Sequence, residues 1–279
     1  EIASCLVGSE MCIRDSFQTA PPMFGYYRLA SAVPQLRIAD VDYNVDRLIA
    51  GFREASEKQA AAVVFPELSI TGYSCGDLFF QPRLRQAALE GLRRFTEATE
   101  KSGTVAIVGL PFLYGDALYN TAAVVQAGRV LALVPKTMLP NYREFYEKRQ
   151  FTSARALGTG TREITVNGAQ VPFGTDIVFH DMSSPFSFGV EICEDLWSVI
   201  PPSSTLALHG ARAILNPSAG TELTGKAAYR RELVKQQSGR CLCAYALSSA
   251  GVHESTTDVV FGGHCLIADN GRLAAESAR

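Results

Sequence analysis

Three ionisable side chains of different kinds each follow an apolar run of the sequence. The three runs and the residues after them are 61–66 with Glu67, 130–135 with Lys136, and 186–192 with Cys193. Short apolar runs predict buried strands, and ligands usually bind where strands end. A thiol placed at the end of a strand suits a positioned nucleophile.

A carboxylate, an ammonium and a thiol can together carry out nucleophilic acyl transfer. The thiol is mostly protonated at neutral pH, a neighbouring ammonium favours the thiolate, and a carboxylate can carry protons between nucleophile, leaving group and water. Lys136 could also stabilise an oxyanion, together with the backbone N–H that follows Cys193. Taken singly, Cys193 could be a buried structural cysteine, and Glu67 and Lys136 could be surface charges. The coincidence of all three favours catalysis.

Several motifs resemble those of a known family. The Glu-Lys-Cys motifs of the nitrilase superfamily are similar to residues 65–68, 135–140 and 191–195. Longer strings resemble the amino-terminal glutaminase domains of bacterial glutamine-dependent NAD synthetases, and these are residues 70–80, 139–149, 201–204 and 254–258. The resemblance runs from about Tyr26 to the end of the chain, in the order of the family.

The resemblance implies a mechanism. Cys193 would attack the side-chain amide carbon of glutamine, ammonia would leave, and water would hydrolyse the γ-glutamyl thioester to glutamate. Glu67 would be the general base and acid, while Lys136 and the backbone N–H of Glu194 would hold the oxyanion. Glu144 matches a second glutamate that orders this network in the family. The alternative for Glu144 is a solvated charge in a run of charged residues.

The same resemblance implies contacts with the substrate. Tyr142 matches a tyrosine that contacts glutamine, and residues 216–220 resemble the loop that lines the glutamine pocket. Gly220 stands where family members often have Ser or Asn, so any contact there must come from its backbone. Lys226 matches a basic position, and its ammonium could pair with the substrate carboxylate. The alternative for Lys226 is a surface charge at the start of a helix.

Length and composition predict one domain with a large α/β core. The chain has 279 residues, of which 47% are hydrophobic. Expected hairpins mixed with crossover helices predict mixed sheets, and the resemblance implies a four-layer α-β-β-α sandwich. We expect this domain to span residues 23–279.

The first residues need a separate explanation. Residues 6–15 have no period or cap and resemble a translated sequencing adapter, so residues 1–16 are left out of the expected fold. We expect residues 1–22 to be a sequence artefact or a disordered leader, and Met23 to be the natural start. Deleting the residues before Met23 should then leave the stability unchanged.

Periodicity and turn residues predict the individual elements. The expected helices are one through Val45, Leu48, Ile49 and Phe52, capped by Asp42 or Asn44, and one beginning at Pro82. The expected strands are 105–110, 122–126, 129–134, 241–248, 265–268 and 273–275, with turns at Ala127-Gly128 and Asp269-Asn270-Gly271. Residues 152–174 are expected to be rich in loops.

Charge and composition argue against several classes of function. A formal charge of −2 and a pI near 6.1 give no reason to expect nucleic acid or an anionic membrane as a partner. No apolar run approaches the ~20 residues that span a bilayer. The cysteines after residue 16 form an odd set without disulfide-framework spacing, which suits a reducing cytoplasm. The scattered histidines lack metal-ligand spacing, so we expect no metal.

Residues 271–279 still resemble the family, so we expect the chain to be a fragment. No Ser-Gly-Gly-x-Asp-Ser loop for ATP is present, and we expect no cofactor in this chain. By resemblance, ATP and Mg would belong to a missing C-terminal synthetase domain, the partner that uses the ammonia to amidate nicotinate adenine dinucleotide. Relatives assemble through this domain, so a homo-oligomer is expected.

Two other functions compete with the glutaminase. A free-standing amidase could act on another small amide, although residues 142–149 and the pocket loop argue against it. A non-catalytic assembly module is the other alternative, and the intact set of Glu67, Lys136 and Cys193 argues against it.

Overall fold

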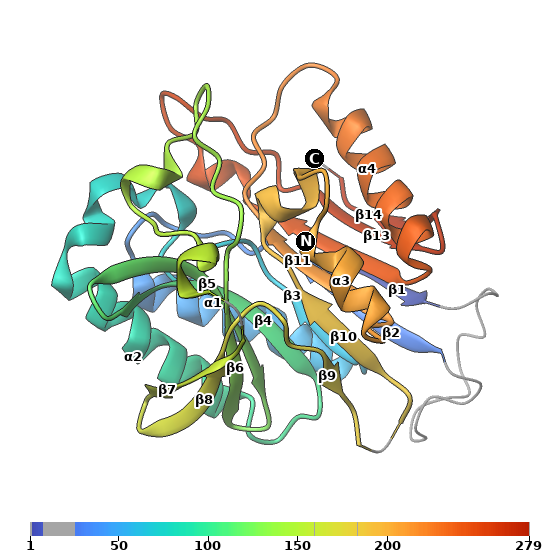
Figure 1. The fold of residues 1–279 in the computed structure, drawn as a ribbon, viewed down its shortest axis with the longest axis horizontal. Coiled ribbons are helices and arrows are strands. Elements are labelled where there is room, and N and C mark those ends of the chain that lie inside the picture. Colours follow the sequence, from blue (N-terminus) through green and yellow to red (C-terminus); the bar gives the residue numbers. More distant parts are fainter. Residues whose placement is uncertain (1, 8–25, 159, 183, 279) are drawn as a thin grey trace.

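The fold is a sandwich of two β-sheets with helices on both outer faces (Figure 1). The computed structural model describes residues 2–7, 26–158, 160–182 and 184–278. Helices α1 (Val41–Glu57) and α2 (Pro82–Ala98) pack on the first sheet, and α3 (Pro202–Leu208) and α4 (Lys226–Cys241) pack on the second. The predicted four-layer α-β-β-α sandwich is therefore confirmed.

Both sheets are mixed. The strands of the first sheet, in spatial order, are β1 (Ile2–Val7), β2 (Tyr27–Ala32), β3 (Ala62–Val64), β4 (Val105–Tyr114), β5 (Ala117–Gln126), β6 (Arg129–Pro135), β8 (Ala169–Phe173) and β7 (Arg162–Val166). Those of the second are β14 (Arg272–Glu276), β13 (Cys265–Asp269), β12 (Ala244–Ser249), β11 (Ala213–Ser218), β10 (Ser187–Val190) and β9 (Phe179–His180). Strands β2, β3 and β4 run parallel, as do β10, β11 and β12, and hairpins extend both sets.

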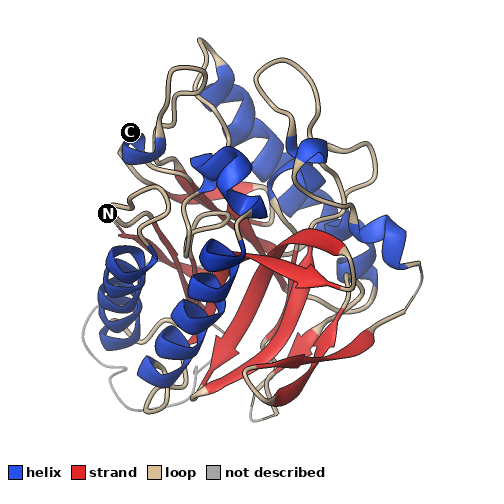
Figure 2. Ribbon diagram, turned by 90° about the vertical axis from the view of Figure 1, so that its left-hand side faces the viewer, coloured by secondary structure: helices blue, strands red, loops and turns tan. Residues whose placement is uncertain are grey.

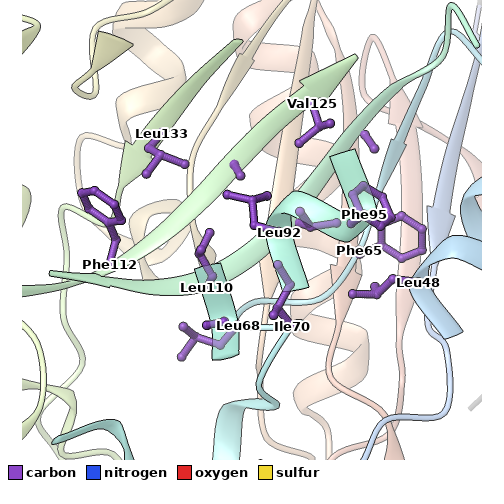
Figure 3. Close-up of a cluster of buried hydrophobic side chains, with 14 of the residues drawn as sticks. Leu48, Phe65, Leu68, Ile70, Leu92, Phe95, Leu110, Phe112, Val125 and Leu133 are labelled. Carbon is purple, nitrogen blue, oxygen red and sulfur yellow. The ribbon is translucent and has the colours of Figure 1, made fainter. Parts of the chain in front are cut away.

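The apolar core covers both faces of the first sheet. One part lies under the helices on the outer face, and the other lies on the inner face toward the second sheet. In Figure 2, two long helices stand side by side over strands, as α1 and α2 do on the first sheet. Their contact is built from buried side chains such as Leu48, Leu92 and Phe95, which face Phe65 and Leu110 of the sheet side (Figure 3). Burying each such side chain contributes roughly 1.5–3 kcal/mol relative to exposure.

A second cluster fills the space between the two sheets. Val64 and Ile107 of the first sheet meet Val190 and Leu215 of the second, and Cys193 belongs to the same buried cluster. The strands that precede the candidate catalytic residues are therefore held by the central core of the molecule.

The sequence predicted most of these elements. Helices α1 and α2 cover the expected residues, and the tight turns have the expected left-handed backbone, with φ of 48° at Ala127 and 47° at Asn270. The predicted cap of α1 was wrong. The N-cap is Asp40, which accepts the Tyr43 N–H at 3.2 Å.

Two predictions about irregular or extended segments were also wrong. Helix α4 continues through Cys241 and Leu242 is its left-handed C-cap, so β12 begins only at Ala244 and Cys241 is a half-buried helix residue. The segment 152–174, expected to be rich in loops, contains the β7–β8 hairpin. Its turn is Asn167-Gly168, and this dipeptide is a hairpin signal that the sequence already contained.

The segment excluded from the fold contributes a strand. Residues 2–7 form β1, which pairs antiparallel with β2 at the edge of the first sheet. Excluding these residues from the fold was therefore wrong. The expectation that residues 1–22 are an artefact or a leader stays a prediction, because Met23 and most of that segment lie outside the described residues.

Candidate active site

Three strand ends bring the predicted catalytic residues together. Glu67 follows β3, Lys136 directly follows β6, and Cys193 follows β10. Glu67 and Lys136 come from the first sheet and Cys193 comes from the second. The backbone at the end of β11 connects them, because the Ser218 carbonyl accepts the Glu67 N–H at 3.2 Å and the Ala219 N–H donates to the Cys193 sulfur at 3.5 Å.

The Lys136 ammonium lies between two carboxylates. Its Nζ donates to Glu67 Oε1 at 2.6 Å and to Glu147 Oε1 at 2.7 Å, and all three side chains are buried. Burial acts to lower the pKa of Lys136, but the carboxylates of Glu147 and Glu67 outweigh it and raise the pKa well above its usual value. Lys136 is therefore a permanent cation inside the protein.

Glu67 has one occupied oxygen and one open oxygen. The Asn120 side-chain N–H donates to Glu67 Oε1 at 2.6 Å, the same oxygen that Lys136 contacts. Glu67 Oε2 is buried and has no hydrogen-bond partner among the described residues. One oxygen is thus anchored, while the other can take or give a proton.

A glycine on β4 makes room for Glu67. A Cβ built on Gly109 would lie 2.1 Å from the Leu68 backbone nitrogen, so only glycine fits there. Leu68 itself adopts a left-handed φ of 52°. This close approach presses the segment that carries Glu67 against the sheet.

The nucleophile candidate sits on a strained turn. Cys193 has a φ of 47°, which is uncommon for a residue with a side chain and costs of order 1–3 kcal/mol. Its N–H donates to Asn216 Oδ1 at 2.9 Å, and the Asn216 amide donates to the Tyr245 hydroxyl at 2.8 Å. The Tyr245 hydroxyl in turn donates to the buried carboxylate of Glu191. This network holds the turn in the strained conformation.

The Cys193 thiol is protonated in the resting site. Burial raises its pKa well above the usual range, and the negative charge of Glu67 raises it further. Lys136 acts in the opposite direction, as the sequence suggested, but its effect is smaller than those two. The thiol therefore needs a base when it attacks, and Glu67 is the charged neighbour that can serve.

Asp195 joins the nucleophile turn to the loop after Lys136. Its Oδ1 accepts the N–H groups of Thr137 at 3.2 Å and Met138 at 2.7 Å, and its Oδ2 accepts the Ile192 N–H at 2.9 Å. Sequence reasoning did not assign this role to Asp195. The available signal was a carboxylate that directly follows the Cys193-Glu194 pair at a buried turn.

The structure places Glu147, and not Glu144, against Lys136. The Glu144 carboxylate instead accepts the Thr221 hydroxyl at 2.7 Å. Glu147 accepts both the Lys136 ammonium and the Tyr73 hydroxyl at 2.7 Å, and burial raises its pKa to about 7. The match of Glu144 to the second glutamate was thus wrong by three residues, because the 140–151 loop has no periodicity from which the sequence could choose.

Two of the predicted substrate contacts meet each other. The Tyr142 hydroxyl donates to Glu194 Oε1 at 2.9 Å. Tyr142 is half exposed, and burial raises the pKa of the Glu194 carboxyl. Glu194 directly follows Cys193 in the chain, so this hydrogen bond places Tyr142 beside the turn that carries the thiol.

Lys226 is not the plain surface charge of the alternative interpretation. Its Nζ donates to the Thr221 hydroxyl at 2.8 Å and lies 5.6 Å from the ring centroids of both Phe145 and Trp197. Burial lowers its pKa. A half-buried ammonium between aromatic rings is suited to bind an anionic group.

Gly220 has its polar groups bonded within the protein. Its N–H donates to Ser249 Oγ at 3.0 Å, and its carbonyl accepts the Arg230 guanidinium at 3.4 Å. An added Cβ would lie 3.2 Å from that guanidinium. The predicted backbone contact from Gly220 to a substrate therefore stays a prediction, while the structure gives this glycine a packing role beside Arg230.

A cavity of about 80 Å³ lies beside the Glu147 carboxylate. It is lined by aromatic and acidic residues that include Tyr73, Glu144, Phe145 and Glu147. Its volume would admit water molecules next to Glu147 Oε2, which has no partner among the described residues.

Within the same described ranges, no group of His, Cys, Asp and Glu is placed to hold a metal ion. None of the helices described is both long enough and apolar enough to cross a membrane.

The carbon-nitrogen hydrolase family model matches residues 28–279, so the chain belongs to this family. A glutamine-dependent NAD(+) synthetase of Mycobacterium tuberculosis strain H37Rv is 40% identical over 257 residues, which are 91% of this chain and 37% of that protein. The same-named protein of Xanthomonas campestris is 34% identical over 87% of this chain and 40% of its own length. The chain therefore spans about two fifths of these relatives, and the family resemblance drawn from its motifs is confirmed.

Solved structures show the same fold. A glutamine-dependent NAD(+) synthetase from Cytophaga hutchinsonii is similar with a TM-score of 0.80 and 28% identity, over 90% of this chain and 40% of that one. An amidase from Nesterenkonia sp. has a TM-score of 0.67 at 21% identity, over 90% of this chain and 85% of that one. The second likeness shows the shared fold alone.

Proposed function

We propose that the chain is a glutaminase that hydrolyses the side-chain amide of glutamine to glutamate and ammonia. The observation that carries the proposal is the buried group of Glu67, Lys136 and Cys193, beside a half-buried ammonium at Lys226. The names of the relatives support glutamine as the substrate.

In the first half of the reaction, the Cys193 sulfur attacks the amide carbon and its proton passes to Glu67. Because the pKa of the thiol is raised, the thiol loses its proton to Glu67 as the sulfur attacks. The carbonyl oxygen becomes an oxyanion, held by the Lys136 ammonium and the backbone N–H of Glu194. Losing one such donor typically costs 10²–10³-fold in rate.

The C–N bond then breaks, and the proton on Glu67 moves to the departing nitrogen, which leaves as ammonia. A γ-glutamyl thioester remains on Cys193. In the second half, Glu67 takes a proton from water, and the water oxygen attacks the thioester carbon. The C–S bond breaks, the sulfur regains the proton, and glutamate is released. Glu147 supports both halves by holding Lys136 in place.

Charged and polar groups near Cys193 would select glutamine. Lys226 would pair with the α-carboxylate, and Glu194 would accept from the α-ammonium. Tyr142 would position Glu194, to which it already donates. The aromatic rings of Phe145 and Trp197 would hold Lys226 in this orientation.

We further propose that the ammonia serves a synthetase domain in a longer protein. That domain would use ATP and Mg to amidate nicotinate adenine dinucleotide to NAD. The support is that this chain matches about two fifths of relatives named glutamine-dependent NAD(+) synthetase.

The test is ammonia release by the purified chain from glutamine, asparagine and a simple amide such as butyramide. We expect turnover of glutamine above the other two, and its loss in Cys193→Ala. The matched control is Cys241→Ala, a half-buried cysteine on α4 that should keep full activity. A preference for butyramide would indicate a general amidase. Absence of ammonia release from every amide, or an active Cys193→Ala variant, would overturn the proposal.

A further inference from the structure

Arg230 is a buried cation with four partners on the segment after β11 and next to β13. The side chain is only 1% exposed. Its Nη1 donates to Glu222 Oε1 at 2.7 Å and to His264 Nδ1 at 2.9 Å. Its Nη2 donates to the carbonyl oxygens of Thr221 at 3.1 Å and Gly220 at 3.4 Å. One guanidinium therefore holds three consecutive residues, 220–222.

Only arginine can make this set of contacts. A guanidinium carries five N–H donors in a fixed plane, whereas a lysine ammonium has three donors on a flexible stem. The absence of a side chain at Gly220 also leaves the space that the guanidinium occupies. Burying the Arg230 guanidinium costs free energy. This cost indicates that the position of residues 220–222 is important.

The anchored segment leads directly to the proposed substrate-binding groups. Arg230 holds the Thr221 carbonyl, while the Thr221 hydroxyl accepts the Lys226 ammonium at 2.8 Å and donates to Glu144 at 2.7 Å. Thr221 is 2% exposed, so its hydroxyl cannot exchange these partners for water. The position of Lys226 thus depends on Thr221, and that of Thr221 depends on Arg230.

A second set of hydrogen bonds, made by His264 and Glu276, holds Arg230 itself in place. Because His264 Nδ1 accepts from Arg230, the ring proton is on Nε2, which donates to Glu276 Oε1 at 2.8 Å. Glu276, at the end of β14, also pairs with Arg231 at 2.6 Å. Burial lowers the pKa of His264, which keeps the ring neutral and able to accept.

We propose that Arg230 is a positioning residue that fixes Gly220 and Thr221, so that the Thr221 hydroxyl orients Lys226 and Glu144 toward the substrate. The proposal rests on the glutaminase function in that Lys226 is taken to bind glutamine. Within the part of the chain that the structure describes, the hydrogen bonds of Arg230 go to residues 220–222 and His264 and to none of Glu67, Lys136 and Cys193, so Arg230 should act on binding more than on the chemical step.

The first test is steady-state hydrolysis of glutamine by Arg230→Met, Arg230→Lys and Arg240→Met. Arg230→Met should raise KM at least about tenfold, with kcat within about threefold of the wild type. Arg230→Lys should recover part of the loss, because it keeps the charge but has fewer donors. Arg240→Met is the matched control, since it removes an exposed cation of the same helix that is outside this set of contacts, and its KM should stay near the wild-type value.

The second test is amide hydrogen exchange of the same variants, which needs no substrate. Exchange in residues 219–226 should be faster in Arg230→Met than in Arg240→Met, with the core strands unchanged. If Arg230→Met fails to fold, the comparison is made with Arg230→Lys. Equal exchange in both variants, or a fall in kcat without a change in KM, would overturn the assignment. A wild-type chain without glutaminase activity would contradict the proposed function, while the exchange result would still decide the role of Arg230.

Discussion

Glu147 and Lys136 form a buried ion pair, with 2.7 Å between the carboxylate oxygen and the ammonium nitrogen. Since Lys136 contacts Glu67 in the same way, one cation serves two carboxylates, and the three groups together carry a net negative charge when all are ionised. Burial in this setting raises the pKa of Glu147 to about 7.

The ion pair distinguishes two glutamates that are three residues apart. Glu147→Gln should lower kcat for glutamine by about 100-fold or more, because Lys136 loses a charged partner and its position changes. Glu144→Gln should act mainly on KM, because Glu144 contacts Thr221. Steady-state kinetics with kcat and KM measured separately checks this. An equal loss of kcat in both variants would contradict the placement.

Lys226 should recognise the carboxylate of the substrate. Lys226→Met should raise KM for glutamine at least about tenfold and leave the hydrolysis of butyramide unchanged, because butyramide has no carboxylate. Lys235→Met is the control on the same helix, where the ammonium pairs with Glu232 at 2.9 Å near the surface. A similar effect of Lys226→Met on the hydrolysis of both amides would show that Lys226 has a structural role alone.

Buried carboxyls should make the chain less stable as the pH rises. Burial raises the pKa of Glu254 from 4.5 to about 7, so between these values the unfolded chain has released a proton that the folded chain still holds. The free energy of unfolding should then fall with rising pH, by up to ~1.4 kcal/mol per pH unit for one proton. Glu147, Glu191 and Asp195 have carboxyl pKa values raised to about 7 in the same way.

Glu254→Gln should make that pH dependence shallower. The amide stays neutral, and its oxygen can still accept the Tyr73 N–H that Glu254 accepts at 2.6 Å. Urea unfolding at about pH 5 and about pH 8 measures the difference, with Glu97→Gln as an exposed control on α2. Parallel pH dependence in the wild type and Glu254→Gln would show that Glu254 does not hold a proton in the folded state.

Two cysteines should differ in their reactivity at rest. The hydrogen bond with the Cys243 thiol lowers the pKa of Cys241 to about 7, and Cys241 is partly exposed. Cys193 is buried with a raised pKa. A maleimide at about pH 7 should therefore label Cys241 well before Cys193, as peptide mapping by mass spectrometry would show. Faster labelling of Cys193 would mean that its resting form is the thiolate.

Residue patterns in the sequence predicted the strands, the hairpins and the side chains at the strand ends, while the four layers were implied by the family resemblance. Apolar runs determine strands, so Glu67, Lys136 and Cys193 could be assigned to strand ends before any contact was known. Turn dipeptides such as Asn270-Gly271 located the hairpins for a similar reason, because few residues adopt a left-handed backbone. These features depend on interactions between residues that are close in the chain, so the sequence alone can indicate them.

Only the tertiary structure decided which charges meet. Glu144 and Glu147 are alike in sequence, and the path of an aperiodic loop selects Glu147 for Lys136. Arg230 stands beside Arg231 on a helix, yet one is buried with four partners and the other is partly exposed and pairs with Glu276. The raised pKa of Cys193 likewise comes from burial and from Glu67, which lies 126 residues away in the chain. Ionisation and pairing depend on distance and solvent access in space, and neither is contained in local residue order.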